Sequence, residues 1–171
     1  MPTRTITDHE VKAFRRFYTL LPRTNDPTLL VLKVHLLIEE QLRQLVDERV
    51  AKPEAVSEAR LDCFQVVCLC EAFCAYETGP KLWNALRKLN KLRNDLAHTL
   101  EPTGVQDRMK NIASLMGLTP EGLRTTELKE EAGPHDAFSF ASSLLFSAVA
   151  ALIKKPSAAI LELVANDHQA L

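Results

Sequence analysis

The sequence predicts an all-α protein, built as an up-and-down helical bundle of four to five main helices with extra terminal helices. Apolar residues recur at three- and four-residue steps through most of the chain, and no alternating pattern lasts long enough to indicate a strand. The composition, with 46% hydrophobic and 25% charged residues, is typical of a globular domain with a packed core. A length of 171 residues fits one domain, so we expect a single domain over residues 1–171.

The first half of the chain is expected to hold three helices. Thr7 and Glu10 have the spacing of a capping box, which predicts a first helix that runs to about residue 21. A second helix is expected at about residues 28–50, where apolar side chains form a continuous stripe that needs a partner. A third is expected at about residues 54–76, and it is apolar on nearly all sides. Such a helix belongs in the centre of a bundle or in a subunit interface.

The second half is expected to hold two more main helices and several shorter segments. The fourth helix is predicted at residues 80–100, and a shorter one at 105–115. The polar stretch at 119–134 predicts one helical turn at most and is our candidate for a lid or strap. Residues 137–153 are apolar but fall a little short of the ~20 residues of a membrane span, so we expect a buried or dimerising helix and no membrane. A short helix is predicted at residues 157–164.

The charge of the chain is nearly balanced. Lys and Arg number 21 against 22 Asp and Glu, for a formal net charge of −1, so a global basic excess for non-specific nucleic-acid binding is absent. Contact with RNA would need a local patch or a substrate site. The first residues, MPTRTITDHEVKAF, contain no apolar segment of signal-peptide length, which predicts a cytoplasmic protein.

Four cysteines fall within one apolar helical stretch. Cys63, Cys68, Cys70 and Cys74 have the spacing C-x4-C-x-C-x3-C, which matches no familiar zinc module. Cys70 and Cys74 share a helical face and could supply two ligands. Reduced cysteine nevertheless behaves as a small buried hydrophobe, so we expect core thiols rather than metal or redox ligands.

Chemistry is concentrated in one run near the end of the fourth helix, from Arg93 to His98. Arg93 points close to the centre of the apolar seam of its helix, where a cation is costly unless it is paired or lies in a cleft. Asn94 and His98 share another face, and Asp95 is expected to face solvent. Arg93 and His98 project ~140° apart on a straight helix, so a small ligand could meet both through the reach of arginine, a distorted last turn or a second copy of the helix.

These residues resemble a known family. The string Lys91-Leu92-Arg93-Asn94-Asp95-Leu96-Ala97-His98 strongly resembles the R-x4-H signature of the HEPN superfamily, including its common form R-N-x-x-A-H. The order of helices over about residues 27–105 is also similar to the bundle order of the family. The resemblance implies a HEPN-like domain with its core at about 27–105 and a dimer with the motif helices at the interface. The N-terminal helix and the segment after Gly104 are not covered by it, and we expect that segment to form a C-terminal helical extension at about 135–165.

The resemblance further implies a metal-independent endoribonuclease site formed by Arg93, Asn94 and His98. His98 would serve as the general base or acid on the ribose 2′-hydroxyl and the leaving oxygen. Arg93 would hold the scissile phosphate, and Asn94 would orient His98 or the phosphate. RNA supplies its own nucleophile, so no metal or cofactor is expected. A toxin of a toxin–antitoxin or defence module is one such role, with a nucleotidyltransferase-type antitoxin as a possible partner.

Other interpretations of the same residues stay open. Arg93 could be an interior arginine tied to Glu39 or Glu40, with Asn94 and His98 closing the helix end. The chain would then be a non-catalytic HEPN-like regulatory or scaffolding protein, similar in kind to the mannitol-operon repressor relatives: a transcriptional or partner-binding module whose partner is a protein or a nucleotide. His35 and Glu39 are an i,i+4 pair, which is more often a core-edge contact than a catalytic dyad.

Overall fold

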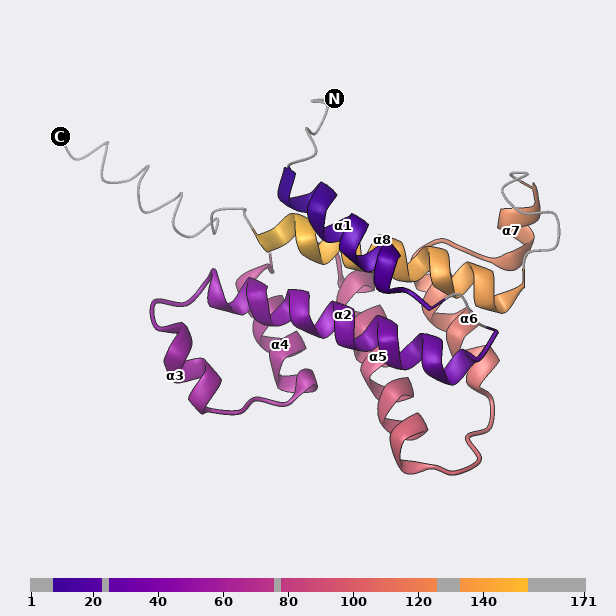
Figure 1. Ribbon diagram of the computed structural model, residues 1–171, viewed down its shortest axis with the longest axis horizontal. Helices are drawn as coiled ribbons and strands as arrows, with labels where there is room; N and C mark the ends of the chain where they lie inside the picture. Colours follow the sequence, from indigo (N-terminus) through magenta and orange to yellow (C-terminus); the bar gives the residue numbers. More distant parts are fainter. Residues whose placement is uncertain (1–7, 23–24, 76–77, 126–132, 154–171) are drawn as a thin grey trace.

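The computed structural model describes residues 8–22, 25–75, 78–125 and 133–153. Within these ranges the chain forms helices and no strand, which confirms the all-α prediction (Figure 1). The helices, in chain order, are α1 (Asp8–Leu20), α2 (Pro27–Asp47), α3 (Pro53–Glu58), α4 (Cys63–Phe73), α5 (Pro80–His98), α6 (Val105–Leu115), α7 (Pro120–Thr125) and α8 (Pro134–Ile153).

Two long helices, α2 and α8, hold the bundle together. α8 packs against α1, α2 and α6, whereas α2 also packs against α4 and α5. In Figure 1, α1 and α8 lie along one side of α2, and α4 and α5 lie on the other. This arrangement places the middle of α2 between the start of α4 and the second half of α5, which is where the candidate site lies.

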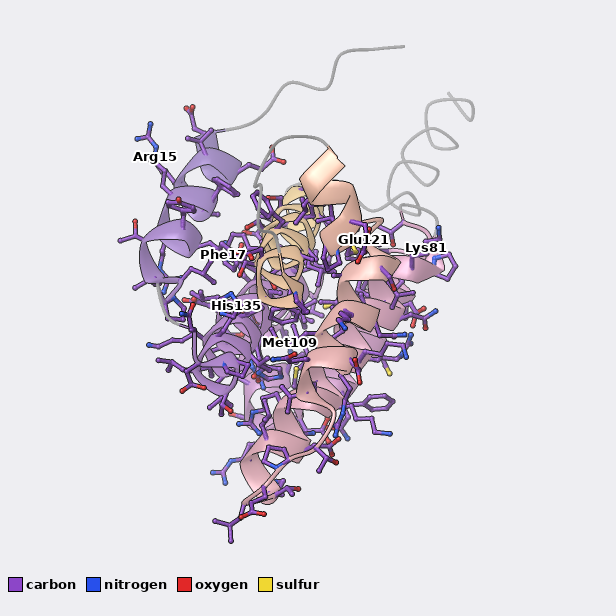
Figure 2. The ribbon with its side chains drawn as sticks, turned by 90° about the vertical axis from the view of Figure 1, so that its right-hand side faces the viewer. Arg15, Phe17, Lys81, Met109, Glu121 and His135 are labelled. Atoms are coloured by element: carbon purple, nitrogen blue, oxygen red, sulfur yellow. The ribbon has the colours of Figure 1, made fainter. Side chains whose placement is uncertain are left out.

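α1 is held on the bundle by an aromatic contact. Phe17 is fully buried, and its ring centroid lies 4.6 Å from that of Phe146 on α8. Figure 2 shows Phe17 on the side of α1 that faces α8, whereas Arg15 points away from the bundle. Because aromatic side chains bury a large apolar area, this pair is a principal anchor of α1.

The prediction of one continuous third helix at about residues 54–76 is wrong. The structure has a short helix, α3, and a separate α4, and Arg60 between them takes a φ of 50°. Asp62 starts α4 with a capping box, because its side chain accepts a hydrogen bond from the backbone N–H of Gln65 while the Gln65 side chain accepts one from the backbone N–H of Asp62. A helix cannot run through this cap, since the N-cap residue has an extended backbone.

The cysteines divide between the core and its edge. Cys70 and Cys74 are fully buried, as expected of core thiols, and the Cys70 thiol lies 3.4 Å from the carbonyl oxygen of Leu42. Cys63 and Cys68 are half-buried, and all four cysteines are free thiols. Cys63 is the first residue of α4; it lines the candidate site and also packs against the edge of the core.

The C-terminal half follows the predicted order with different bounds. α8 begins at Pro134 and has 20 residues, so by length and composition alone it is long and apolar enough to cross a membrane. More than half of its most apolar stretch is buried inside the bundle, which is the environment of a core helix. The predicted strap contains α7, whereas residues 126–132 and the predicted helix at 157–164 lie outside the described residues.

Candidate functional site

The motif helix α5 places Arg93 beside a polar cavity. Its core side carries a row of buried apolar residues that ends at Leu92, and the next residue, Arg93, is half-buried. The cavity has a volume of about 250 Å³ and lies where α2, the start of α4 and α5 meet. Nearly all of its lining residues are polar or charged: His35, Glu39, Arg43, Asp62, Cys63, Phe64, Asn90, Arg93 and Asn94.

The Arg93 guanidinium is held by a neutral side chain. Its Nη1 donates a hydrogen bond to Oδ1 of Asn94 over 3.1 Å, and among the described residues no carboxylate forms an ion pair with it. Glu39 is bound by Arg43 and Glu40 by Arg16. Both glutamates that could have tied Arg93 as a structural residue are therefore engaged by other arginines. A half-buried cation without a carboxylate partner is suited to bind an anion.

His98 lies apart from this cavity. It is the last residue of α5, its side chain is exposed, and it does not line the cavity with Arg93 and Asn94. Asn94 accepts its hydrogen bond from Arg93, so within one chain it orients the guanidinium. This placement follows from the wide angle between the two side chains on a regular helix. One chain thus brings Arg93 and Asn94 together and leaves His98 on another surface.

A buried histidine forms the floor of the cavity. His35 is 3% exposed, and its Nε2 lies 3.0 Å from Oδ1 of Asn90, which is 7% exposed. Within the described ranges its Nδ1 has no hydrogen-bond partner, and Oε2 of Glu39 lies 3.6 Å from it. Burial lowers the pKa of His35, against the opposing effects of Asn90 and Glu39, and Arg93 lowers it further.

Cys63 also lines the cavity, close to this histidine. Burial raises the pKa of its thiol to about 12, and the negative charge of Glu39 adds to the rise. The sequence patterns predicted a simple helical pair for His35 and Glu39 and a core thiol for Cys63, and they did not single out Asn90. A signal was present for Asn90, because a polar residue inside the apolar seam of α5 requires a buried partner.

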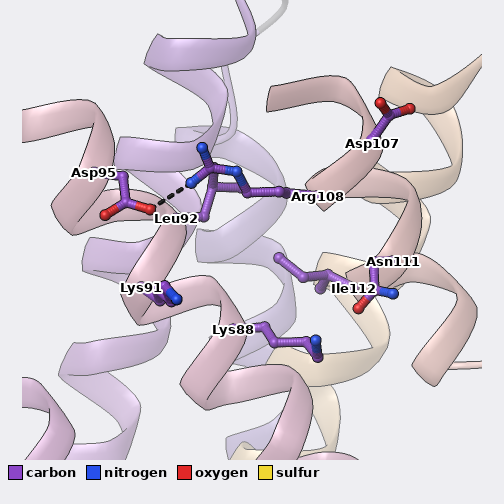
Figure 3. Close-up of a pocket in the computed structure, with 8 residues that line it drawn as sticks. All are labelled: Lys88, Lys91, Leu92, Asp95, Asp107, Arg108, Asn111 and Ile112. Atoms are coloured by element: carbon purple, nitrogen blue, oxygen red, sulfur yellow. Dashed lines mark hydrogen bonds and ion pairs between the residues drawn. The ribbon is translucent and has the colours of Figure 1, made fainter. Parts of the chain in front are cut away.

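A second, larger cavity lies on the other side of the motif helix. It has a volume of about 510 Å³ and lies between α5 and α6 (Figure 3). Asp95 accepts a hydrogen bond from Arg108, which also donates to the carbonyl oxygen of Thr103 over 2.9 Å. Asp95, expected to face solvent, is therefore half-buried in an ion pair. Lys88 and Lys91 are exposed on the α5 side of this cavity, so α5 presents two lysines beside the motif, while Asp95, Asp107 and Arg108 line the cavity with them.

No protein-family model matches the chain, and no curated protein or solved structure is significantly similar to it. The fold and the site alone therefore define the class: an all-α bundle in which three helices surround a polar cavity. The arginine that lines this cavity has no carboxylate partner within the described part of the chain.

Proposed function

We propose that this protein is a HEPN-type, metal-independent endoribonuclease that acts as a homodimer in the cytoplasm. The observation that carries the proposal is the environment of Arg93. Its side chain lines a polar cavity and donates to the neutral amide of Asn94, and among the residues that the structure describes it forms no ion pair with a carboxylate, Glu39 and Glu40 included. Phosphate is the anion that this motif would meet in RNA, and arginine binds phosphate through several directed N–H groups.

The proposed reaction uses the ribose as nucleophile. His98 removes the proton of the 2′-hydroxyl, the 2′-oxygen forms a bond to phosphorus, and the bond from phosphorus to the 5′-oxygen breaks. A protonated histidine then returns a proton to that leaving oxygen. Arg93 stabilises the negative charge that gathers on the phosphate, and Asn94 fixes the guanidinium through its hydrogen bond.

The separation of Arg93 and His98 leads us to propose a composite site. A two-fold axis that pairs two motif helices would let His98 of one chain reach the phosphate held by Arg93 of the other. Lys88 and Lys91 lie on the same helix and would contact the RNA backbone. A toxin of a toxin–antitoxin module, with a nucleotidyltransferase-type antitoxin, is the biological role that we propose for such an enzyme.

Subunit complementation tests this proposal. The wild-type protein should cleave RNA in the presence of EDTA, and Arg93→Ala and His98→Ala should each lower the rate by about 10²-fold or more. When the two inactive variants are co-expressed, half of randomly formed dimers are mixed, and each mixed dimer holds one intact pair. Activity should therefore return to about a quarter of the wild-type value.

Arg15→Ala is the matched control, because Arg15 is an exposed arginine on α1, far along the chain from the motif. It should leave cleavage unchanged. The composite site would be contradicted if the wild type and the two motif variants were equally active. It would also be contradicted if the wild type cleaved RNA but co-expression of the two inactive variants restored no activity.

One observation favours a second function, a non-catalytic HEPN-like regulatory protein that binds a partner. Within a chain, His98 is exposed and contributes nothing to the cavity that contains Arg93. For this alternative, folded wild-type protein would leave RNA intact, and Arg93→Ala would weaken binding of the partner without any change in RNA.

A further inference from the structure

Three potential metal ligands converge on the floor of the Arg93 cavity. Nδ1 of His35, a carboxylate oxygen of Glu39 and Sγ of Cys63 all lie within 4.8 Å of one another. His35 and Glu39 are one turn apart on α2, and Cys63 is the first residue of α4. Three ligand types therefore reach one point from two helices that pack together.

The hydrogen bond of His35 fixes which nitrogen faces this point. Oδ1 of Asn90 can only accept a hydrogen bond, so Nε2 of His35 carries the proton and donates it over 3.0 Å. The neutral ring then has its lone pair on Nδ1, which is buried and has no hydrogen-bond partner among the residues that the structure describes. The atom nearest to it on Glu39 is another acceptor, Oε2, at 3.6 Å. Nδ1 of His35 and Oε2 of Glu39 therefore face each other as two hydrogen-bond acceptors. A positively charged group between them, such as a metal ion, would satisfy both.

We propose that His35, Glu39 and Cys63 bind a divalent transition metal ion of the zinc type, with the fourth coordination position open to the cavity that Arg93 and Asn94 line. An imidazole nitrogen, a thiolate and a carboxylate together suit Zn²⁺, and three protein ligands with one open position are a common zinc arrangement. This site departs from the expectation that the chain binds no metal. It does not depend on the proposed ribonuclease activity, whose chemistry uses no metal.

The surrounding side chains hold the ligands as a metal site requires. Asn90 sets the tautomer and the plane of the His35 ring. Arg43 donates to Oε1 of Glu39 from Nε at 3.1 Å and from Nη2 at 2.6 Å, which leaves Oε2 directed toward His35. The same Nη2 lies 3.1 Å from the carbonyl oxygen of Leu61, so Arg43 also holds the backbone just before Cys63.

Binding requires a small closure and the loss of one proton. Metal bonds of about 2.0–2.3 Å place the ligand atoms of a tetrahedral site about 3.3–3.8 Å apart, so the cluster must contract by about 1 Å. Cys63 is at the end of its helix and is half-buried, which allows this movement. Its thiol releases a proton to solvent and binds as the thiolate, while Nδ1 of His35 and Oε2 of Glu39 bind without losing one.

Cobalt titration tests the site directly. Reduced protein is treated with EDTA, freed of chelator, and titrated with Co²⁺, which reports thiolate ligation by a charge-transfer absorption band. One equivalent should bind with this band, and one equivalent of Zn²⁺ should remove it. Cys63→Ser should abolish the band, and Glu39→Gln should weaken binding at least tenfold.

Matched controls separate this cluster from other thiols and carboxylates. Cys68→Ser changes a half-buried cysteine on the same helix, and Glu40→Gln changes the neighbour of Glu39; both should bind Co²⁺ like the wild type. Far-ultraviolet circular dichroism confirms that each variant is folded. A folded wild type that shows no band, or a band that survives Cys63→Ser, would overturn the proposal. RNA cleavage in EDTA is measured separately, so failure of the metal site leaves the ribonuclease test intact.

Discussion

The hydrogen bond between Asn90 and His35 offers the sharpest test of how the cavity floor is built. Both side chains are buried, and each supplies a polar atom that the other satisfies across the α2–α5 contact. Asn90→Ala removes the acceptor and leaves the Nε2–H of His35 buried without a partner. His35→Leu replaces the donor by an apolar group of comparable size and leaves the Asn90 amide unsatisfied.

The expected magnitudes follow from this burial. An unsatisfied buried polar group costs about 1–3 kcal/mol, and the smaller alanine side chain leaves a cavity as well. We therefore expect Asn90→Ala to lower the free energy of unfolding by about 2–3 kcal/mol, which is a drop in Tm of about 4–12 °C for a chain of this size. In the double variant neither unsatisfied group remains, so its loss should be smaller than the sum of the single losses by about 1–2 kcal/mol.

Urea unfolding followed by circular dichroism, with EDTA present throughout, measures all four corners of this cycle. Asn84→Ala is the matched control, because Asn84 is an exposed asparagine on the same helix, and its effect should be within about 0.5 kcal/mol. Losses that add to within about 0.5 kcal/mol would show that the two side chains are not coupled, and the account of the cavity floor would be refuted.

Three further predictions concern the fold and its pH dependence. Phe17→Ala should lower the free energy of unfolding by about 3–5 kcal/mol and speed proteolysis within α1, because the ring contact with Phe146 is lost; unchanged proteolysis would contradict this role. Asp62→Ala should cost about 1 kcal/mol in urea unfolding through loss of the α4 cap, and an unaltered midpoint would argue against the cap. Burial lowers the pKa of His35 in the folded protein, so below pH ~6.5 this residue binds more protons in the unfolded protein than in the folded protein. The free energy of unfolding, measured in EDTA, should therefore fall as the pH decreases from ~6.5 toward the pKa that His35 has in the folded protein. His35→Leu should flatten that slope, and an equal slope in both proteins would assign it to other groups.

Local sequence patterns predicted most of the helices but not their breaks. Apolar periodicity placed the second helix at 28–50 and the fourth at 80–100, close to the observed α2 and α5. The error at 54–76 arose because apolar residues on both sides of Asp62 suggested one continuous helix. The D-x-x-Q spacing of Asp62 and Gln65 indicated a helix start there, and the local cap overrode the apolar run.

The candidate site was only partly accessible to such patterns. The unusual position of Arg93 on an apolar seam correctly pointed to a pairing or a cleft, and the structure gives the cleft. The Arg16–Glu40 pair could not be predicted, because it joins α1 to α2, whereas the Glu39–Arg43 pair has the i,i+4 spacing of neighbours on one helix. For the same reason the convergence of Cys63 with His35 required the packing of two helices that are separate in sequence.

The two proposals place a metal ion and an RNA phosphate in the same cavity. Arg93 shares its cavity with the proposed metal site, so a bound cation would add positive charge where the phosphate of RNA is proposed to bind. His98 of the same chain lies outside that cavity, but in the proposed dimer His98 of the other chain reaches the phosphate held there. If both proposals hold, zinc should therefore alter both the KM for RNA and kcat, because its charge lies beside the bound phosphate and beside the histidine that acts on it.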